Sequence, residues 1–258
     1  MRGGSGDAPC GRGTAAGAAE RGDAVRRVRV HIPGAAAGSR IMLPAGEAHH
    51  VRDVLRLGEG AILEVIDGEG RRRGAVIVAA AGGRVEVAVA ADSEETCAPA
   101  PVTVAAALVK KGLDDAVRGI VEIGAARFVP LVTARTVKGL EPRTERWTRI
   151  AAEAQKQCGR SRRLEIMPCR SFEDFLAAVP PGTRFVADVA APGLLATRAA
   201  GAPPPYEILI GPEGGFTGEE LSAMAAAGCR PASLGAYTLR TETAVVVAAA
   251  VLVQAAGP

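Results

Sequence analysis

Residues 209–217, Leu-Ile-Gly-Pro-Glu-Gly-Gly-Phe-Thr, have the composition of a ligand-binding loop. An apolar run ends there in glycines, and Thr217 with Glu220 has the spacing of a capping box for a following helix. Glycines let a ligand approach the main chain, and ligands of open α/β sheets bind beyond the carboxyl ends of strands. The pattern is neither a GxGxxG fingerprint nor a P-loop, and an ordinary strand-to-helix turn has the same spacing.

Residues 234–244, Leu-Gly-Ala-Tyr-Thr-Leu-Arg-Thr-Glu-Thr-Ala, repeat the pattern of strand, loop and helix. Thr241 is the expected N-cap, and Glu242 suits the positive end of a helix dipole. That structural role accounts for Thr-Glu-Thr but not for Arg240, which precedes an almost wholly apolar helix. Because this helix has no polar face, we expect it to be buried in its own domain or against a second subunit.

A cluster of basic residues is expected on a helix around Trp147 and in the stretch that follows it. Its members are Arg143, Arg146, Arg149, Lys156, Arg160, Arg162 and Arg163. Such a cluster can bind phosphates. A solvated helix face with favourable charge at the helix end explains it equally well. Lys110 and Lys111 form a second, smaller patch.

No metal site is expected. His49 and His50 are adjacent, so on a helix they project in different directions, and no cysteine or carboxylate spacing completes a ligand set. The cysteines are scattered and odd in number, which is typical of reduced cytosolic thiols. They are Cys10, Cys97, Cys158, Cys169 and Cys229.

The first third of the chain is predicted to be a small β-barrel over residues 26–97. Runs with period-two alternation predict strands at 27–31, 61–66, 73–79 and 84–89, and one short helix is expected at 49–57 with Val51, Val54 and Leu55 on one face. Residues 1–25 have low complexity and predict a disordered arm, or lie upstream of the true start. The polar, proline-rich residues 92–101 are the expected linker.

Residues 98–258 are predicted to alternate strands and helices. Strands are expected at 102–109, 127–132, 184–189, 206–210 and 231–234. Helices are expected from Leu113 to the cap at Gly124, around Trp147, from a capping box at Ser171 through Val179, after Thr217, and over 242–255. Repeated βα units predict an α/β domain with a mainly parallel sheet covered by helices.

The composition is that of a globular protein, with 258 residues, 48% hydrophobic and 23% charged. No apolar run is long enough to span a membrane, and the first residues lack the apolar core of a signal peptide. The net charge of +3 is only weak support for a polyanionic partner.

Taken in order, these segments resemble the RsmE family of the SPOUT superfamily over about residues 26–255. The shared segments are residues 49–56 (HHVRDVLR), 111–112 (KG), 122–125 (EIGA), 130–131 (PL), 146–147 (RW), 153–154 (EA), 157–160 (QCGR), 210–216 (IGPEGGF), 234–235 (LG) and 239–244 (LRTETA). Residues 236–238, Ala-Tyr-Thr, replace a bulkier and more basic stretch of the family, and Cys158 stands where serine is usual.

The resemblance implies methylation of N3 of a uridine in 16S ribosomal RNA of the 30S subunit, with S-adenosylmethionine as cofactor. It implies a PUA-like first domain, a trefoil-knotted SPOUT domain, a homodimer, a cytoplasmic location and no membrane partner. The implied cofactor residues are Leu209, Ile210, Gly211, Pro212, Glu213, Gly214, Leu234, Gly235, Leu239, Arg240, Thr241, Glu242, Thr243 and Ala244.

The RNA-binding residues expected from the basic segments and the resemblance are His49, His50, Arg52, Arg56, Lys110, Lys111, Arg146, Arg160 and Arg162. Arg160, Arg162, Arg240 and Glu242 are the candidates for orienting the base or acting near the transfer. Two alternatives stay open, which are a SPOUT enzyme that methylates a ribose 2′-oxygen and a non-catalytic RNA-binding assembly factor.

Overall fold

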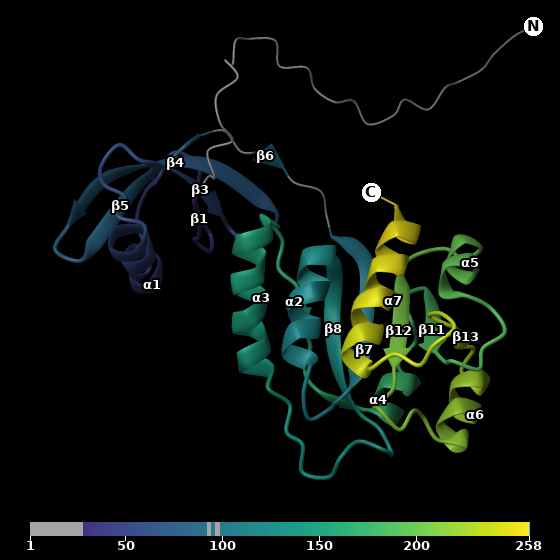
Figure 1. Cartoon of the computed structure of the whole chain (residues 1–258). Helices are drawn as coiled ribbons and strands as arrows, with labels where there is room; N and C mark the ends of the chain where they lie inside the picture. Colours follow the sequence, from purple (N-terminus) through teal and green to yellow (C-terminus); the bar gives the residue numbers. More distant parts are fainter. Residues whose placement is uncertain (1–27, 92–93, 96–98, 258) are drawn as a thin grey trace, which may run out of the picture.

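The computed structural model describes residues 28–91, 94–95 and 99–257, and the expected arm at 1–25 lies outside them. Figure 1 shows two bodies, a β-rich N-terminal one and a larger α/β one. Each body has its own sheet and its own cluster of buried apolar side chains.

Six short strands form the N-terminal sheet in the described part of the chain. They are β1 (Val28–His31), β2 (Arg40–Met42), β3 (Ile62–Ile66), β4 (Arg71–Ala81), β5 (Arg84–Val89) and β6 (Glu94–Glu95). Their order is β1-β3-β4-β5-β2, and β6 pairs with β4. The four strands that the alternating pattern predicted are confirmed. β6 falls within the expected linker, so that stretch pairs partly with the first sheet.

The expected helix at 49–57 is displaced in the structure. An α-helix, α1 (Ala45–His49), continues into a π-helical turn, η1 (His50–Val54). The Leu55 amide donates to the His50 carbonyl at 3.0 Å, five residues back. This wider turn changes which side chains face inward, so Val51 is buried whereas Val54 is 58% exposed. The prediction, which assumed 3.6 residues per turn, therefore placed Val54 and Leu55 wrongly on the buried face of the helix.

The second sheet is parallel throughout, as predicted. Its described strands are β7 (Ala100–Ala107), β8 (Ala125–Val132), β9 (Glu165–Ile166), β10 (Arg170–Ser171), β11 (Thr183–Ala187), β12 (Tyr206–Ile210) and β13 (Arg230–Ala232). Their order is β10-β8-β7-β12-β11-β13, with β9 beside β8. Side chains alternate between its faces, so Val104 and Ile208 join one buried cluster while Ala105 and Leu209 join another.

Helices cover both faces of this sheet. The helices α2 (Leu113–Ile123), α3 (Thr144–Cys158), α5 (Leu195–Ala200) and α7 (Thr241–Ala256) pack on the face of Val104. The helices α4 (Phe172–Ala177) and α6 (Gly218–Ala226) pack on the other face. Figure 1 shows α2, α3 and α7 side by side in front of the strands.

One helix ends earlier than expected. The Ser171 hydroxyl accepts the Asp174 amide at 3.0 Å, which confirms the start of α4. The helix stops at Ala177, however, and Val179 is 90% exposed instead of packed. Val179 precedes Pro180, and a residue before proline is pushed out of the helical region.

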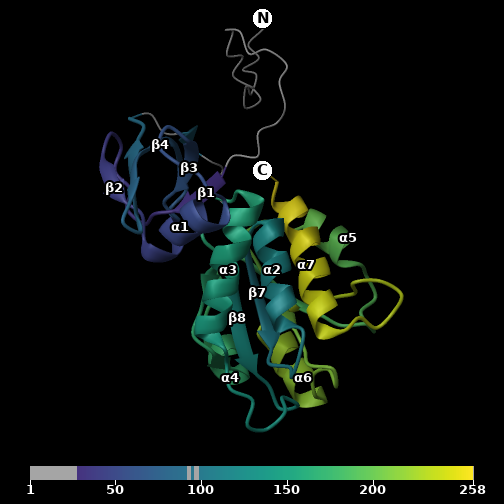
Figure 2. The ribbon, with the colours of Figure 1, turned by 60° about the vertical axis from the view of Figure 1, so that its left-hand side comes forward.

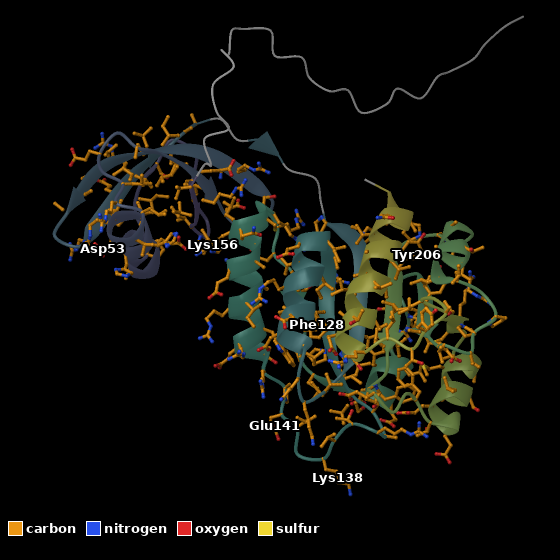
Figure 3. All side chains as sticks on the ribbon, viewed as in Figure 1. Asp53, Phe128, Lys138, Glu141, Lys156 and Tyr206 are labelled. Carbon is orange, nitrogen blue, oxygen red and sulfur yellow. The ribbon has the colours of Figure 1, made fainter. Side chains whose placement is uncertain are left out.

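The N-terminal sheet contacts the carboxyl end of α3 (Figures 2 and 3). The Arg29 guanidinium donates to the buried Glu64 carboxylate at 2.6 Å and to the carbonyls of Lys156 and Gln157 at 3.5 and 3.3 Å. Arg72 donates to the carbonyl of Gly159 at 3.5 Å. Because the last carbonyls of a helix lack intrahelical donors, two arginines satisfy them here and join the two bodies.

Candidate cofactor cavity and basic groove

Three loops meet around one cavity of about 220 Å³ at the carboxyl ends of β11, β12 and β13. The cavity is lined by Ala187, Asp188, Val189, Ile210, Gly211, Pro212, Glu213, Gly215, Phe216, Leu221, Leu234, Gly235, Tyr237, Thr238, Leu239, Thr241 and Ala244. Both glycine-bearing segments contribute, so the structure brings together what the sequence showed only as two similar patterns. The position at strand ends is where open α/β sheets bind ligands.

The loop after β12 is folded back on itself. A side-chain carbon at Gly211 would lie 3.2 Å from the Phe216 ring, which packs directly over this glycine. Gly215 has φ +70° and donates its amide to the Pro212 carbonyl at 2.8 Å. Thr217 and Glu220 form both bonds of the predicted capping box, so the loop ends at a fixed helix start. The main chain of 211–213 is thereby presented to the cavity.

The loop after β13 depends on a backbone conformation that favours glycine. Gly235 has φ +146°, and a side-chain carbon there would meet no atom within 4 Å. The conformation, not the available space, therefore favours glycine. The Ser233 hydroxyl donates to the Gly235 carbonyl at 2.9 Å and accepts its amide at 3.2 Å, which fixes the turn.

Thr241 is not the N-cap that we expected. Arg240 occupies the N-cap position of α7 without a side-chain bond, and Thr241 is the first helical residue. Its hydroxyl is instead used in a long-range contact, donating to the Gly211 carbonyl at 3.0 Å. This bond joins the two loops, and Thr241 and Ala244, one helical turn apart, both line the cavity.

The loop after β11 belongs to the cavity and was missed. Ala187, Asp188 and Val189 line the cavity. The segment that comes next in the sequence lies beside the chain that follows β13, since the Leu195 amide donates to the Ser233 carbonyl at 2.8 Å. In the sequence, the end of a predicted strand at residue 189 was the feature that could have indicated this loop. Without a recognisable helix cap it resembled any other strand end. Gly215, Phe216, Leu221, Tyr237 and Thr238 were missed as well.

Five residues of the expected cofactor set do not line the cavity: Leu209, Gly214, Arg240, Glu242 and Thr243. Leu209 points to the opposite face of the sheet, as alternation requires. The Gly214 carbonyl accepts from the Arg135 guanidinium outside the lining. The Arg240 side chain is 85% exposed, and Glu242 packs against Gly112, where an added side-chain carbon would lie 2.7 Å from its carboxyl carbon.

The charge of the lining suits a cation. Asp188 and Glu213 supply carboxylates, and the lining contains neither lysine nor arginine. The remainder is mostly apolar side chains and main chain, including Ile210, Leu234 and Leu239. A cation with an apolar part and groups that bond to backbone therefore fits the cavity.

A larger groove of about 740 Å³ lies beyond the end of β7. Six basic residues line it, against four acidic ones. The basic residues are Lys110, Lys111, Arg118, Arg143, Arg146 and Arg149, and the acidic residues are Asp114, Asp115, Glu141 and Glu153. Arg146 and the indole nitrogen of Trp147 both donate to Asp114, at 2.7 and 3.0 Å. The groove reaches Gly112, against which Glu242 packs, so the first turn of α7 lies between the groove and the cofactor cavity.

Arg160 and Arg162 lie at the junction of the two bodies and line neither cavity. The Arg160 guanidinium donates to the carbonyls of Arg162, Val121 and Arg163 at 2.6, 3.2 and 3.4 Å. Burial lowers the pKa of Arg160 to about 10, so it stays charged at neutral pH. The Arg162 backbone forms bridges with Gly68 and Glu69.

The remaining expected RNA-binding residues, His49, His50, Arg52 and Arg56, lie on or just after the helical turn of the first body. Arg52 donates twice to Asp53 at 2.6 Å, and His49 lies 2.6 Å from the same carboxylate. The bonds from Arg52 lower the pKa of Asp53 to about 2. Figure 3 labels Asp53 on this turn. The described residues contain no group of three potential metal ligands.

Comparison with known proteins identifies both bodies. Residues 96–253 match an RNA methyltransferase domain, and residues 43–90 match an RNA methyltransferase PUA domain. The chain is 34% identical over 227 residues to the ribosomal RNA small subunit methyltransferase E of Synechocystis, covering 81% of this chain and 71% of the relative. The chain belongs to the ribosomal RNA small subunit methyltransferase E (RsmE) family.

Solved structures agree with membership of the RsmE family. A Legionella pneumophila methyltransferase in complex with S-adenosylmethionine has a TM-score of 0.80 at 28% identity, over 88% of this chain and 97% of the other. The Neisseria gonorrhoeae RsmE bound to S-adenosylmethionine has a TM-score of 0.79 at 25% identity, over 87% and 95%. The predicted PUA-like domain and the SPOUT-type methyltransferase domain with its mainly parallel sheet are confirmed.

Proposed function

We propose that this protein transfers a methyl group from S-adenosylmethionine to N3 of a uridine in 16S ribosomal RNA of the small subunit. The observation that carries the proposal is the acidic and apolar cavity at the ends of β11, β12 and β13, in a chain of the RsmE family. Two solved relatives hold S-adenosylmethionine, whose cationic and apolar character matches this lining.

Except for Tyr237, whose ring stands exposed at the rim, the cavity residues bind and orient the cofactor. When bound, S-adenosylmethionine supplies a methyl group already activated by its sulfonium sulfur. The carboxylates of Asp188 and Glu213 offset that positive charge, and Leu234 and Leu239 exclude water from the site. The bond from Thr241 to Gly211 holds the two loops together. Much of the acceleration then comes from alignment, since the methyl group needs no further activation.

The proton on N3 of the uracil must leave before or during methyl transfer. We expected Glu242 and Arg240 to act near the transfer, and we now propose Glu242 as the group that accepts this proton and Arg240 as a cation that pairs with the RNA beside the reacting base. Both flank Thr241, which lines the cavity, and the two side chains lie 4.0 Å apart. Arg160 and Arg162 lie in the domain junction, which favours an RNA-positioning role over contact with the reacting atoms.

The RNA is proposed to bind across both bodies in the context of the 30S subunit. Lys110, Lys111 and Arg146 line the basic groove beside the start of α7, which supports their expected role in RNA binding. On the first body, His49, His50, Arg52 and Arg56 form the corresponding surface. We retain residues 26–97 as the RNA-binding domain and 98–258 as the methyltransferase domain.

A homodimer is the proposed assembly. One stripe of α7 packs against α2, β7 and α5, but the opposite stripe stays partly exposed although it is mostly apolar. This stripe contains Thr243, Val247, Ala250, Val251 and Gln254. A second copy would cover it.

None of the described helices is long and apolar enough to cross a membrane. We propose a cytoplasmic location, where small-subunit RNA is modified.

The test is methyl transfer from labelled S-adenosylmethionine to 30S subunits that lack the modification, followed by nucleoside analysis. Labelled N3-methyluridine is the expected product. Label in a ribose would keep the fold and cofactor but overturn the proposed acceptor. Cofactor binding without transfer to 30S subunits or to free 16S RNA would overturn the enzymatic proposal and favour a non-catalytic assembly factor.

A further inference from the structure

One aromatic residue of this chain is exposed, whereas all the others are buried. The chain has five Phe, two Tyr and one Trp, and all of them are described by the structure. Seven are buried, with at most 8% of their surface exposed. The eighth, Tyr237, is 83% exposed. An aromatic ring contributes most to folding when it is buried, so the 83% exposure of Tyr237 suits a contact with a partner outside the folded chain.

The position of Tyr237 indicates what that contact is. It lies in the loop between β13 and α7 and lines the cofactor cavity, so the ring stands at the cavity's rim. The turn at Gly235, clamped by Ser233, holds the base of this loop. Any nucleobase that receives a methyl group from this cavity must pass next to the loop. Tyr237 is also a departure from the bulkier, basic stretch expected at residues 236–238.

Two neighbouring side chains complete a surface suited to a single-stranded nucleotide. Arg240, at the other end of the same loop, is 85% exposed and can pair with a phosphate. Val189, from the loop after β11, lines the same cavity and is 60% exposed, which adds a second apolar contact. An exposed aromatic ring and an exposed cation in the same loop are the kinds of side chain with which proteins hold unstacked RNA bases.

We propose that Tyr237 stacks on a nucleobase of the ribosomal RNA at the mouth of the cofactor cavity, with Arg240 holding an adjacent phosphate. The inference rests on the proposed function, because it takes the RNA as substrate. Tyr237 thereby holds the target nucleotide, or its direct neighbour, out of the RNA stack while the uridine enters the cavity. The ring face, not the phenol hydroxyl, makes this contact.

The test compares Tyr237→Phe, Tyr237→Leu and Tyr237→Ala with the wild type in filter binding to 30S subunits that lack the modification. Loss of one stacked base weakens RNA binding by about 5- to 150-fold, and we expect this for Leu and Ala. Phe keeps the ring, so its affinity should stay within about 2-fold of the wild type. Val179→Ala, at an exposed site away from the cavity, is the matched control and should bind as the wild type does.

Two further measurements separate stacking on RNA from other uses of the ring. Calorimetry with S-adenosylmethionine should give unchanged affinity for all variants, and sedimentation should give an unchanged oligomeric state. Wild-type RNA binding by the Leu and Ala variants overturns the inference. Weakened cofactor binding would instead make the ring a cofactor lid, and a changed oligomeric state would make it a subunit contact. A wild-type protein that binds 30S subunits without methylating them refutes the proposed function, while the binding comparison still decides the role of Tyr237.

Discussion

Single side chains fix the shape of the cofactor cavity through contacts with the main chain. The Thr241 hydroxyl reaches the Gly211 carbonyl from the next loop, although sequence alone assigned it to helix capping. A threonine can take either role, because its hydroxyl can cap its own helix or donate to a distant carbonyl. Which bond forms depends on whether an acceptor lies nearby, and only the folded sheet places the Gly211 carbonyl there.

Thr241→Val removes this hydroxyl and keeps the shape of the side chain. One neutral hydrogen bond contributes about 0.5–1.5 kcal/mol, so we expect S-adenosylmethionine to bind about 2- to 12-fold more weakly by calorimetry. Thr243→Val, two residues along and exposed, is the control and should bind normally. Equal affinities for both variants would show that the bond between the loops has no part in cofactor binding.

Gly112, at the start of α2, lies close to the first turn of α7. It has φ +95°, and an added side-chain carbon would lie 2.7 Å from the Glu242 carboxyl carbon. Gly112→Ala should therefore destabilise the protein by about 1 kcal/mol or more in urea unfolding, from backbone strain and from displacement of Glu242. Gly46→Ala, with φ in the ordinary range and open space around it, should not destabilise. Similar losses in both variants would contradict this reading of Gly112.

Several helices of this protein begin or end at residues that favour a helix end, such as capping residues, glycine and proline. The capping box at Thr217 and the glycine at 124, with φ +104°, mark their helix ends as predicted. Proline at 180 stops α4 earlier than the apolar pattern indicated, and a π-helical turn changes the register after His49. Hydrogen-bonding caps are visible in sequence because they are local, whereas π turns depend on the packing around them.

Thr217→Ala tests the contribution of the capping box to the element that closes the glycine loop. Loss of an N-cap hydroxyl costs about 1 kcal/mol, so the free energy of unfolding in urea should fall by about that amount. The control is Ser222→Ala in the exposed middle of α6, which removes a hydroxyl without removing the cap. A loss as large for Ser222→Ala would mean that the cap contributes nothing specific.

At the scale of the whole molecule, the junction of the two bodies sets the position of the PUA-like domain. Arg29 links the buried Glu64 to the carbonyls that end α3, and Lys156 of that helix pairs with Glu47. Figure 3 labels Lys156 at this junction. Arg29→Ala leaves Glu64 without one of its two arginine partners. We expect faster amide exchange in both the N-terminal sheet and residues 156–159 by mass spectrometry. Arg84→Ala, outside this junction, is the control.

The same junction predicts a pH dependence. His31 accepts from Arg163 at 2.9 Å, and burial together with the charges of Arg163 and Lys156 lowers its pKa, against the opposing influence of Glu47 and Asp67. The folded protein therefore binds fewer protons at His31 than the unfolded chain does. This contribution to stability is complete above pH 6.5 and declines as the pH falls below 6.5 towards the lowered pKa.

Unfolding in urea at pH 7.5 and 5.5 measures this contribution. The wild type should lose more stability on acidification than His31→Gln, which cannot titrate. His50→Gln, an exposed histidine of the first body, should keep the wild-type dependence. An identical loss in the wild type and His31→Gln would place the pH dependence elsewhere.

The sequence by itself determined the two-domain class, the parallel sheet, most of the strands and helices, and both glycine-bearing loops. These features follow from short-range patterns, since periodicity, caps and glycines act within a few residues of each other. Only the tertiary structure decided that the loop after β11 joins them, that Thr241 bonds to Gly211 and that Arg160 and Arg162 lie in the domain junction. Those outcomes depend on strand order, which places residues far apart in sequence side by side and is not encoded in any local pattern.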